Sequence, residues 1–363
     1  MERISARSPF YVVAPTYNGS TTVEPLEVGF KVKIWEGDIV IDKPTAETYT
    51  YTKQPRYEGD THIFIELSKQ IQDYLIHQFQ ADTTVDYLVR PVFVEINVQT
   101  SYSGGVIDET NTYIALDAYG SYKQGLNYSF DDILINNNSI SVLDGSTIRI
   151  PVITDGDSYE FQFRNNTTVL EDITVTSAAI TDTENAVFIV DSIEAGINNV
   201  LIKNLTQVTE YVMDVELVTE CIYTPIKCVF VNKQGVKQDL WFYKQSKESI
   251  KSDTKDYKAN ILTESMNVNV PILSYDSTAH QRVKYNTNSK KTIECNTGYI
   301  DEGLNVVVEE MINSEYVWLV IDDVVYPVDN KTQSQELMTK RNDQLIKYTF
   351  KFDYSFDEIQ NVR

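Results

Sequence analysis

The sequence predicts a mainly β protein, built of tandem antiparallel β-sandwich modules with two short helices packed on the sheets. Three observations lead to this prediction. Apolar and polar residues alternate along many short segments, Asn- and Gly-containing turns separate these segments, and only two segments show helical spacing. Alternation with period two places every second side chain on one face of a strand. Such half-buried strands are typical of antiparallel sheets, whereas parallel sheets favour continuous apolar runs.

The clearest strands are recognised by this alternation. In chain order they are Phe30–Ile34, Val92–Val98, Tyr159–Phe163, Tyr211–Leu217 and Tyr348–Phe356. In the last of them, five aromatic residues alternate with Thr349, Lys351, Asp353 and Ser355. We therefore expect its aromatic side chains to share one buried face of a sheet.

Turns are predicted between Ile133/Ile135 and Ile140/Val142, after Tyr159–Phe163, and between Cys228–Val231 and Leu240–Tyr243. The turn segments are Asn136–Asn138, Asn165-Asn166 and Asn232–Gly235. Asn and Gly tolerate the positive φ that tight hairpin turns require. Many short strands joined by such turns favour sandwiches of immunoglobulin-like or fibronectin-III-like form.

Two segments are predicted to be helical. In Ser68–Phe79, apolar residues recur along one face, and Ser68 is suited to cap the N-terminus. In Glu302–Ser314, the residues Leu304, Val307, Val308, Met311 and Ile312 form a continuous apolar stripe. We expect each stripe to pack on a sheet.

The length of 363 residues suggests two or three domains. We predict an N-terminal β module with one helix (1–125), a middle all-β domain (126–218) and a C-terminal β module with one helix (219–363). The charged stretch Lys244–Lys258 is expected to be an exposed loop or arm rather than core.

The acidic composition excludes some classes of partner. The formal net charge is −22, and phosphate recognition depends on Lys and Arg. We therefore expect no direct sequence-specific nucleic acid partner and no membrane partner. Averaged over the surface, this charge makes copies repel one another, which predicts weaker assembly at low salt.

The sequence contains no recognised catalytic motif. The histidines, His62, His77 and His280, belong to no recognised catalytic motif. Asp155-Gly156-Asp157 lacks the pattern of an EF-hand loop, and Asp131-Asp132 and Asp322-Asp323 are expected to be exposed turns. A glycan hydrolase would need two converging carboxylates, and the sequence does not single out a pair. We thus predict no catalytic, cofactor-binding or metal residue, no cofactor, and no enzyme activity.

The cysteines and the apolar segments give no sign of a disulfide framework, a zinc site, a secretory signal or a membrane span. Cys221, Cys228 and Cys295 have neither disulfide-framework nor zinc-site spacing and are expected to be free thiols. No secretory signal and no apolar run long enough to cross a membrane are recognised.

Tyrosine is abundant, with 24 residues. Nine lie in segments expected to be loops or turns: Tyr17, Tyr49, Tyr51, Tyr57, Tyr102, Tyr122, Tyr257, Tyr275 and Tyr299. Exposed tyrosine suits protein–protein contact, because it offers rigid area with a polar tip, and it also suits stacking on sugars. Ordinary packing is the third interpretation.

Four groups of segments, taken in order, carry a resemblance to a known family. They are Ser8–Val12 with Val32–Asp38 and Asp42–Pro44; Thr112–Gly120 with Gln124-Gly125; Cys228–Gly235 with Asp239–Phe242; and Asn296–Glu302 with Asn313–Glu315, Tyr326–Val328, Asn342–Thr349 and Phe352–Phe356. Together they resemble a virion structural protein family of crAss-like tailed phages of Bacteroidales, of the neck or tail ring type. The middle domain is outside this resemblance.

The resemblance implies a non-enzymatic structural component of a phage virion, in the neck or a tail ring. Its partners would be copies of itself in a ring and other virion proteins, such as portal, ring or tail proteins. It would be assembled in the host bacterial cytoplasm and end up in the virion. The alternative is a host-facing fibre, adhesin or carbohydrate-binding protein, suggested by the Asn-, Thr- and Tyr-rich middle domain.

Overall fold

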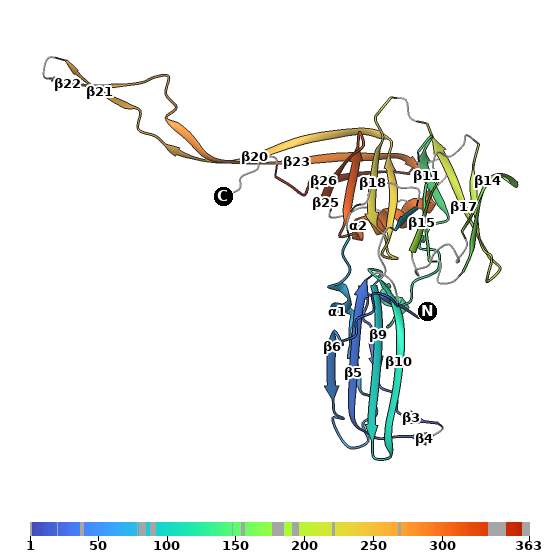
Figure 1. Ribbon diagram of the computed structural model, residues 1–363. Coiled ribbons are helices and arrows are strands. Elements are labelled where there is room, and N and C mark those ends of the chain that lie inside the picture. The colour runs from blue at the N-terminus through green and yellow to red at the C-terminus, as the bar shows by residue number, and fades with distance from the viewer. Residues whose placement is uncertain are drawn as a thin grey trace.

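The computed structural model confirms a mainly β protein with antiparallel sheets and two short α-helices among the residues it describes (Figure 1). It describes residues 2–19, 21–36, 40–77, 79, 85–87, 92–146, 148–153, 157–175, 185–190, 196–219, 222–267, 270–332 and 346–357. Within these ranges, no helix has the length and apolar character needed to span a membrane.

The N-terminal part is built on a five-stranded sheet. Its order is β1 (Glu2–Ser5), β10 (Gly105–Leu116), β9 (Val92–Tyr102), β5 (Pro25–Glu36) and β6 (Tyr49–Lys53). One face carries the predicted apolar residues, such as Phe30, Val32 and Ile96, and is covered by the β2–β7 pair (Tyr11–Val13, Phe64–Glu66) and by α1 (Ser68–Gln72). A small hairpin, β3 (Tyr17–Asn18) with β4 (Thr21–Thr22), lies beside it.

The middle part has two sheets that enclose one core. The larger sheet has the order β11 (Ser139–Leu143), β17 (Thr209–Val218), β16 (Asn199–Asn204), β13 (Tyr159–Asn165) and β14 (Thr168–Val175). The smaller sheet contains β12 (Ile148–Ile153), β15 (Asn185–Val190) and β8 (Val85–Tyr87), which comes from the N-terminal third of the chain. Tyr159, Phe161 and Phe163 are fully buried in this core, as their alternation predicts.

The C-terminal part is a seven-stranded sheet. Its order is β19 (Lys237–Phe242), β18 (Ile226–Val231), β24 (Val317–Ile321), β25 (Val324–Asn330), β26 (Ile346–Tyr354), β23 (Arg282–Ile300) and β20 (Lys244–Lys258). The helix α2 (Asn305–Asn313), preceded by a 3₁₀ turn at Glu302–Leu304, packs its apolar stripe on the sheet. Four of the five aromatic residues predicted to share a buried face do so, whereas Phe356 follows the strand and is 42% exposed.

The first helix is shorter than predicted. It ends at Gln72, and Leu67 occupies the N-cap position rather than Ser68, whose hydroxyl donates to the Glu66 carboxylate instead. The chain then turns, and His77 is buried in the segment that follows. The expected half-buried helical face is therefore reduced to Ile71, with Leu75 buried in the turn that follows.

Other expectations are also corrected. Two strand pairs at sheet edges are parallel, β1 with β10 and β11 with β17. Asn136–Asn138 does not connect a hairpin, because Ile133 makes only an isolated bridge and β11 pairs with β17. The turns at Asn165-Asn166 and Asn232–Gly235 are hairpin turns as predicted, with positive φ at Asn166 and Gly235.

Candidate interaction surface

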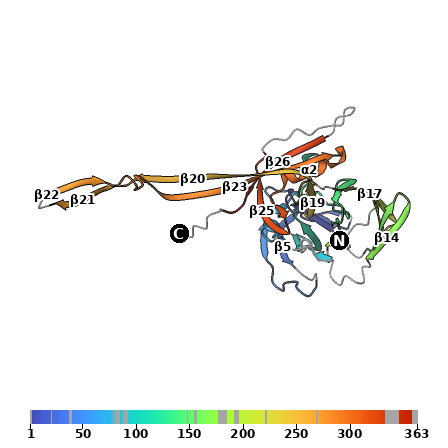
Figure 2. The ribbon, with the colours of Figure 1, turned by 90° about the horizontal axis from the view of Figure 1, so that it is seen from above.

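A long two-stranded arm projects from the seven-stranded sheet (Figures 1 and 2). The strand β23 pairs with β26 only over Thr292–Ile300, so beyond Thr292 it pairs only with β20. We define the arm as residues 250–291. It ends in a second ribbon, β21 (Leu262–Asn267) with β22 (Val270–Tyr275). At ~3.3 Å per residue, the path from Ile250 to Asn267 is roughly 60 Å long. The stretch Lys244–Lys258 is therefore an exposed arm as predicted, but it is a β-strand rather than a loop.

The root of the arm is bulged in both strands. Register shifts occur between Lys244 and Lys247 in β20 and between Asn296 and Tyr299 in β23. Gly298 has a φ of +75°, and a Cβ there would lie 3.2 Å from Cγ of Lys244. Bulges bend a strand and increase its twist. They therefore determine the direction in which the arm leaves the body.

Side-chain hydrogen bonds tie the root to β26. The hydroxyl of Thr297 accepts from the backbone N–H of Tyr348 at 3.0 Å, and the hydroxyl of Thr292 donates to Asp353 at 2.9 Å. Tyr354 donates its hydroxyl to the Glu248 carboxylate at 2.9 Å. Burial raises the pKa of Tyr354, and the Glu248 carboxylate adds to the rise, so the hydroxyl keeps the proton it donates.

The arm exposes apolar and aromatic side chains. Ile250 is 63% exposed, and Leu273, near the tip, is 68% exposed. The rings of Tyr257 and Tyr285 pack across the two strands, with centroids 6.2 Å apart, while both residues remain more than half exposed. A two-stranded ribbon is at best marginally stable alone. Its exposed apolar area and unpaired edges are available for contact with another surface.

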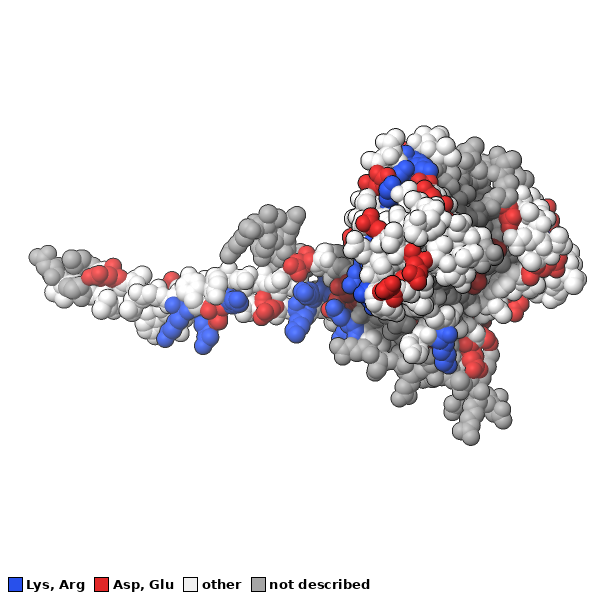
Figure 3. Space-filling model, turned by 90° about the horizontal axis from the view of Figure 1, so that it is seen from below, with Lys and Arg blue, Asp and Glu red and all other residues white. Residues whose placement is uncertain are grey.

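Charge is divided unequally between the arm and the rest of the chain. Seven of the 31 Lys and Arg residues and four of the 53 Asp and Glu residues lie in 250–291, so the arm carries +3 and the remainder −25. In Figure 3, basic side chains are grouped along the arm, whereas acidic ones are numerous on the body. The net charge of −22 is therefore the sum of a basic arm and a strongly acidic remainder.

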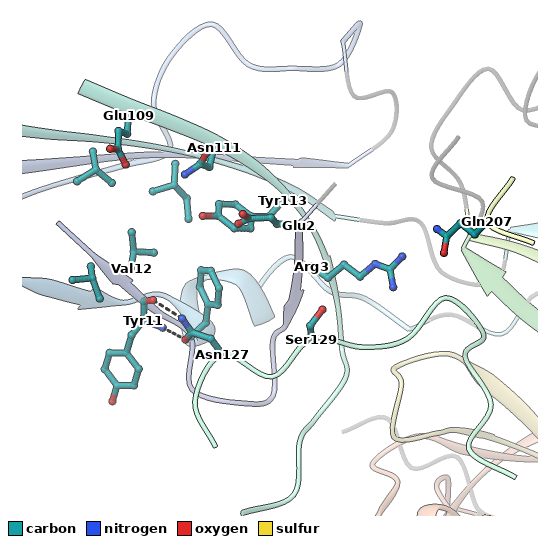
Figure 4. A pocket seen from close by; sticks show the side chains of 14 residues that line it. Glu2, Arg3, Tyr11, Val12, Glu109, Asn111, Tyr113, Asn127, Ser129 and Gln207 are labelled. Atoms are coloured by element: carbon teal, nitrogen blue, oxygen red, sulfur yellow. Dashed lines mark hydrogen bonds between the residues drawn. The ribbon is translucent and has the colours of Figure 1, made fainter. Parts of the chain in front are cut away.

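A groove lies at the edge of the N-terminal sheet (Figure 4). Its volume is about 730 Å³, and it lies between the inner face of β9 and β10 and the strand β2. Glu2 and Glu109 line it, together with Asn111 and Tyr113. Burial raises the pKa of Tyr113 to about 12, and the Glu2 carboxylate adds to this rise. The third charged group in the lining, Arg3, is paired with Asp132, so the two carboxylates make the groove acidic.

The strand edge beside this groove is open. β1 pairs with β10 only at Tyr113–Leu116. Among the described residues, Gly105–Thr112 of β10 therefore has a strand neighbour on one side only, which is β9. Such an edge presents unpaired backbone N–H and C=O groups to an additional strand.

A buried polar junction joins the middle and C-terminal parts of the body. Nδ2 of Asn232 donates to the carbonyl of Leu134 at 2.7 Å, and Nε2 of Gln238 donates to Asn137 at 2.9 Å. The buried carboxylate of Glu310 accepts from Asn136 at 2.6 Å and from the backbone N–H of Lys233 at 3.3 Å. Burial raises the pKa of Glu310. Next to this network, apolar side chains from all three parts form one cluster: Trp35, Phe93, Ile114, Leu116, Ala118, Phe130, Leu134, Ile153 and Val236.

The polar residues considered in the sequence do not come together. His62 is exposed and precedes β7, and His280 lies in an exposed turn of the arm. Nε2 of His77 lies 2.8 Å from Asp117, with both side chains buried. Asp322-Asp323 forms an exposed hairpin turn, as predicted. The expectation for Asp131-Asp132 is wrong in part, because Asp132 is half-buried and pairs with Arg3.

The remaining candidates are the Asp155–Asp157 segment and the cysteines. Asp155 and Gly156 lie outside the described residues, and Asp157 accepts from Asn204 and Gln207. Cys228 and Cys295 are free and buried, and Cys221 lies outside the described residues. No cluster of three or more metal-ligating side chains occurs in the part of the chain that the structure describes.

Six of the nine tyrosines singled out in the sequence are exposed: Tyr17, Tyr57, Tyr122, Tyr257, Tyr275 and Tyr299. Four of these six lie in strands rather than loops. Tyr49, Tyr51 and Tyr102 are half-buried. The sequence did not indicate the groove, because its lining comes from distant segments of the chain, around Glu2, Tyr11, Ile96 and Glu109.

Comparisons with known proteins identify no family for this chain. No family model matches the chain, and no curated protein is significantly similar to it in sequence. Among solved structures, the tandem immunoglobulin domains A164-A165 of titin are 9% identical, and the match covers 54% of this chain and 90% of that chain, with a TM-score of 0.20. The cadherin-like domains 1 to 4 of zebrafish RET are 8% identical, with coverage of 74% and 62% and a TM-score of 0.11.

Proposed function

We propose that this protein is a non-enzymatic structural component of a tailed phage virion, a neck or tail ring protein that assembles through contacts between its own copies and with other virion proteins. The resemblance of the terminal thirds to crAss-like virion proteins motivates the virion role. The observation that carries the assembly role is the arm, which extends roughly 60 Å from the body and exposes Ile250, Leu273 and two open strand edges.

A contact between the arm of one copy and the body of the next would be of the kind from which rings are built. If the arm of one copy contacts a different surface of the next copy, the contact is heterologous. Heterologous contacts that close by rotation produce rings. The body supports this role, because Gly235 and the junction network fix the C-terminal sheet, from which the arm grows, against the other two parts.

The test is the mass of the full chain in solution, with negative-stain images of the same sample. Closed rings are expected. In a matched variant, residues 250–291 are replaced by Asn-Gly, which joins Ser249 to Thr292 across a pair of directly opposed positions. This variant should remain folded, with an unchanged circular dichroism melt, and should lose assembly.

Virion location needs a separate measurement. In purified phage particles, the chain should be found in a fixed ratio to the portal protein. Absence from particles, together with binding of the middle domain to glycans on an array, would replace the proposal by the adhesin alternative. Assembly that is unaffected by removal of the arm would contradict the role given to the arm.

A further inference from the structure

The arm and the groove have complementary properties, and this complementarity identifies the partner of the arm. We infer that the arm of one copy docks along the open edge of β10 in a second copy, with its lysine face over the carboxylates of Glu2 and Glu109. The inference rests on the proposed assembly function and specifies both contact surfaces.

One face of the arm carries an excess of positive charge. Lys251 and Lys255 lie on one face of β20 with Asp253 between them, while Lys247, just outside the arm, is opposite Glu294. Lys290 of β23 lies directly opposite Lys251. Among the described residues, neither Lys251 nor Lys290 has an ion-pair partner. Like charges directly opposite each other destabilise a strand pair, so this face favours an anionic partner.

Both surfaces have open backbone edges. β20 is the outermost strand of its sheet, and β23 is open on its other side from Arg282 to Lys291 among the described residues. The edge of β10 is open over the eight residues Gly105–Thr112 within the described part of the N-terminal sheet. Pairing of one open edge with another adds backbone hydrogen bonds, and the side chains on alternate positions supply specificity.

The acidic groups of the groove lie beside this open edge. Glu109 and Asn111 share the face of β10 that lines the groove, and Glu2 lies at its side (Figure 4). A strand added at this edge directs every second side chain to the same face. Lysines on one face of the arm would therefore meet the groove carboxylates.

The arm of the same copy does not supply this contact. Figures 1 and 2 show that the arm leads away from the body, while the groove belongs to the N-terminal sheet beneath. The occupant is consequently the arm of another copy. The contact joins two different surfaces, as a ring requires.

The experiment is a charge exchange between two full-length variants. The arm variant carries Lys251→Glu and Lys255→Glu, and the groove variant carries Glu2→Lys and Glu109→Lys. Each alone should self-associate at least about tenfold more weakly than wild type by sedimentation velocity, because like charges then face each other. Mixed in equal amounts, the two should assemble again, since each arm meets a groove of opposite charge in the other variant.

Two controls carry the same charge changes elsewhere. Lys123→Glu with Lys331→Glu changes exposed lysines of the body, and Glu171→Lys with Asp172→Lys changes an exposed acidic pair on β14, another edge strand. Both controls should assemble like wild type. Loss of assembly with the β14 variant but not with the groove variant would overturn the inference.

The remaining outcomes separate the inference from the proposed function. Assembly of wild type and of both charge variants alike would overturn the inference and leave the ring function standing. A wild-type chain that stays monomeric at high concentration would overturn both. Zero-length coupling of lysine to carboxylate in a mixture of isotopically labelled and unlabelled chains should join Lys251 or Lys255 to Glu109 between copies. Coupling within one copy only would contradict the inference.

Discussion

Gly235 lies against the backbone of Asp117, so closely that a Cβ on Gly235 would be 2.6 Å from the carbonyl carbon of Asp117. This contact joins the hairpin turn of the C-terminal sheet to the segment that leaves the N-terminal sheet. The carbonyl of Lys233 accepts from the backbone N–H of Tyr119 at 2.9 Å beside it. Gly235 is thus required twice, for its φ of +81° and for the close approach.

Replacement of Gly235 by alanine should therefore destabilise the protein more than an ordinary loop glycine does. A left-handed alanine costs about 1–2 kcal/mol, and displacement of the Asp117 backbone adds to this. Gly145→Ala is the matched control, because Gly145 has a φ of +77° with no atom within 4 Å of the added Cβ. Urea unfolding should give a lower free energy of unfolding for Gly235→Ala than for Gly145→Ala. Equal losses would show that the contact is not close in solution.

Phe350 is predicted to be essential for folding of the C-terminal sheet. It is fully buried, its ring centroid lies 5.9 Å from that of Phe242, and it belongs to the core that also contains the apolar residues of α2. Phe350→Asp removes about 3–5 kcal/mol of packing and also buries a charge, which together exceed the margin of a typical domain. Circular dichroism and a thermal melt should show loss of structure, whereas Phe356→Asp, at an exposed position, should remain folded. A folded Phe350→Asp monomer would instead place Phe350 in an interface.

The buried carboxylate of Glu310 should make stability depend on pH. Burial raises its pKa above the ordinary value of 4.5, so the folded state binds this proton more tightly than the unfolded state. The contribution of Glu310 to stability should therefore improve as the pH falls from neutral towards 4.5 and change no further below that. The difference in free energy of unfolding between wild type and Glu310→Gln should follow this course. Glu309→Gln, at the exposed neighbouring position, controls for the loss of a charge.

The two buried thiols should be inert in the folded protein. Burial raises the pKa of Cys295 to about 12 and that of Cys228 well above its ordinary value. The thiolate is the reactive species. In a Cys221→Ser background, a disulfide reagent should therefore leave both thiols unmodified under native conditions and modify both in urea. Rapid native modification of either would show that the sheet opens locally.

Salt should weaken assembly rather than strengthen it. The mean charge of −22 predicts repulsion between copies and weaker assembly at low salt. The separation of a +3 arm from a −25 remainder predicts the opposite, because screening acts most strongly on the arm–body attraction. Sedimentation at increasing sodium chloride should show progressive dissociation. Tighter association at higher salt would restore the repulsion argument.

The sequence predicts the strands well because each of them buries one face. Phe161 and Phe350 are found in cores because the period of their neighbours assigns them to the inner face. The first helix is overestimated because its apolar spacing continues beyond Gln72, although the chain is drawn away to bring His77 to Asp117. That pair joins residues 40 positions apart, which no local pattern reports.

The candidate surfaces are predictable only in part. The exposed character of Lys244–Lys258 follows from its composition, and its projection depends on pairing with β23, whose partner residues lie 24 to 52 positions later. The groove depends on the early end of the parallel β1–β10 pairing at Tyr113, which is a matter of sheet topology. The Asn136–Asn138 segment is polar in sequence and yet contributes to the junction, because Asn137 and Glu310 satisfy their hydrogen bonds there.

The paired bulges at the root set the direction of the arm, so a small rotation there produces a large displacement at its tip. A rotation of about 5° at the base of a ribbon roughly 60 Å long moves its tip by about 5 Å, which is close to the spacing between neighbouring strands. The residues that decide where the tip arrives are therefore Lys244–Lys247 and Asn296–Tyr299, far from any surface the tip would touch. Evolution could alter the circumference of an assembly by editing these few positions, while the core of each subunit stays the same.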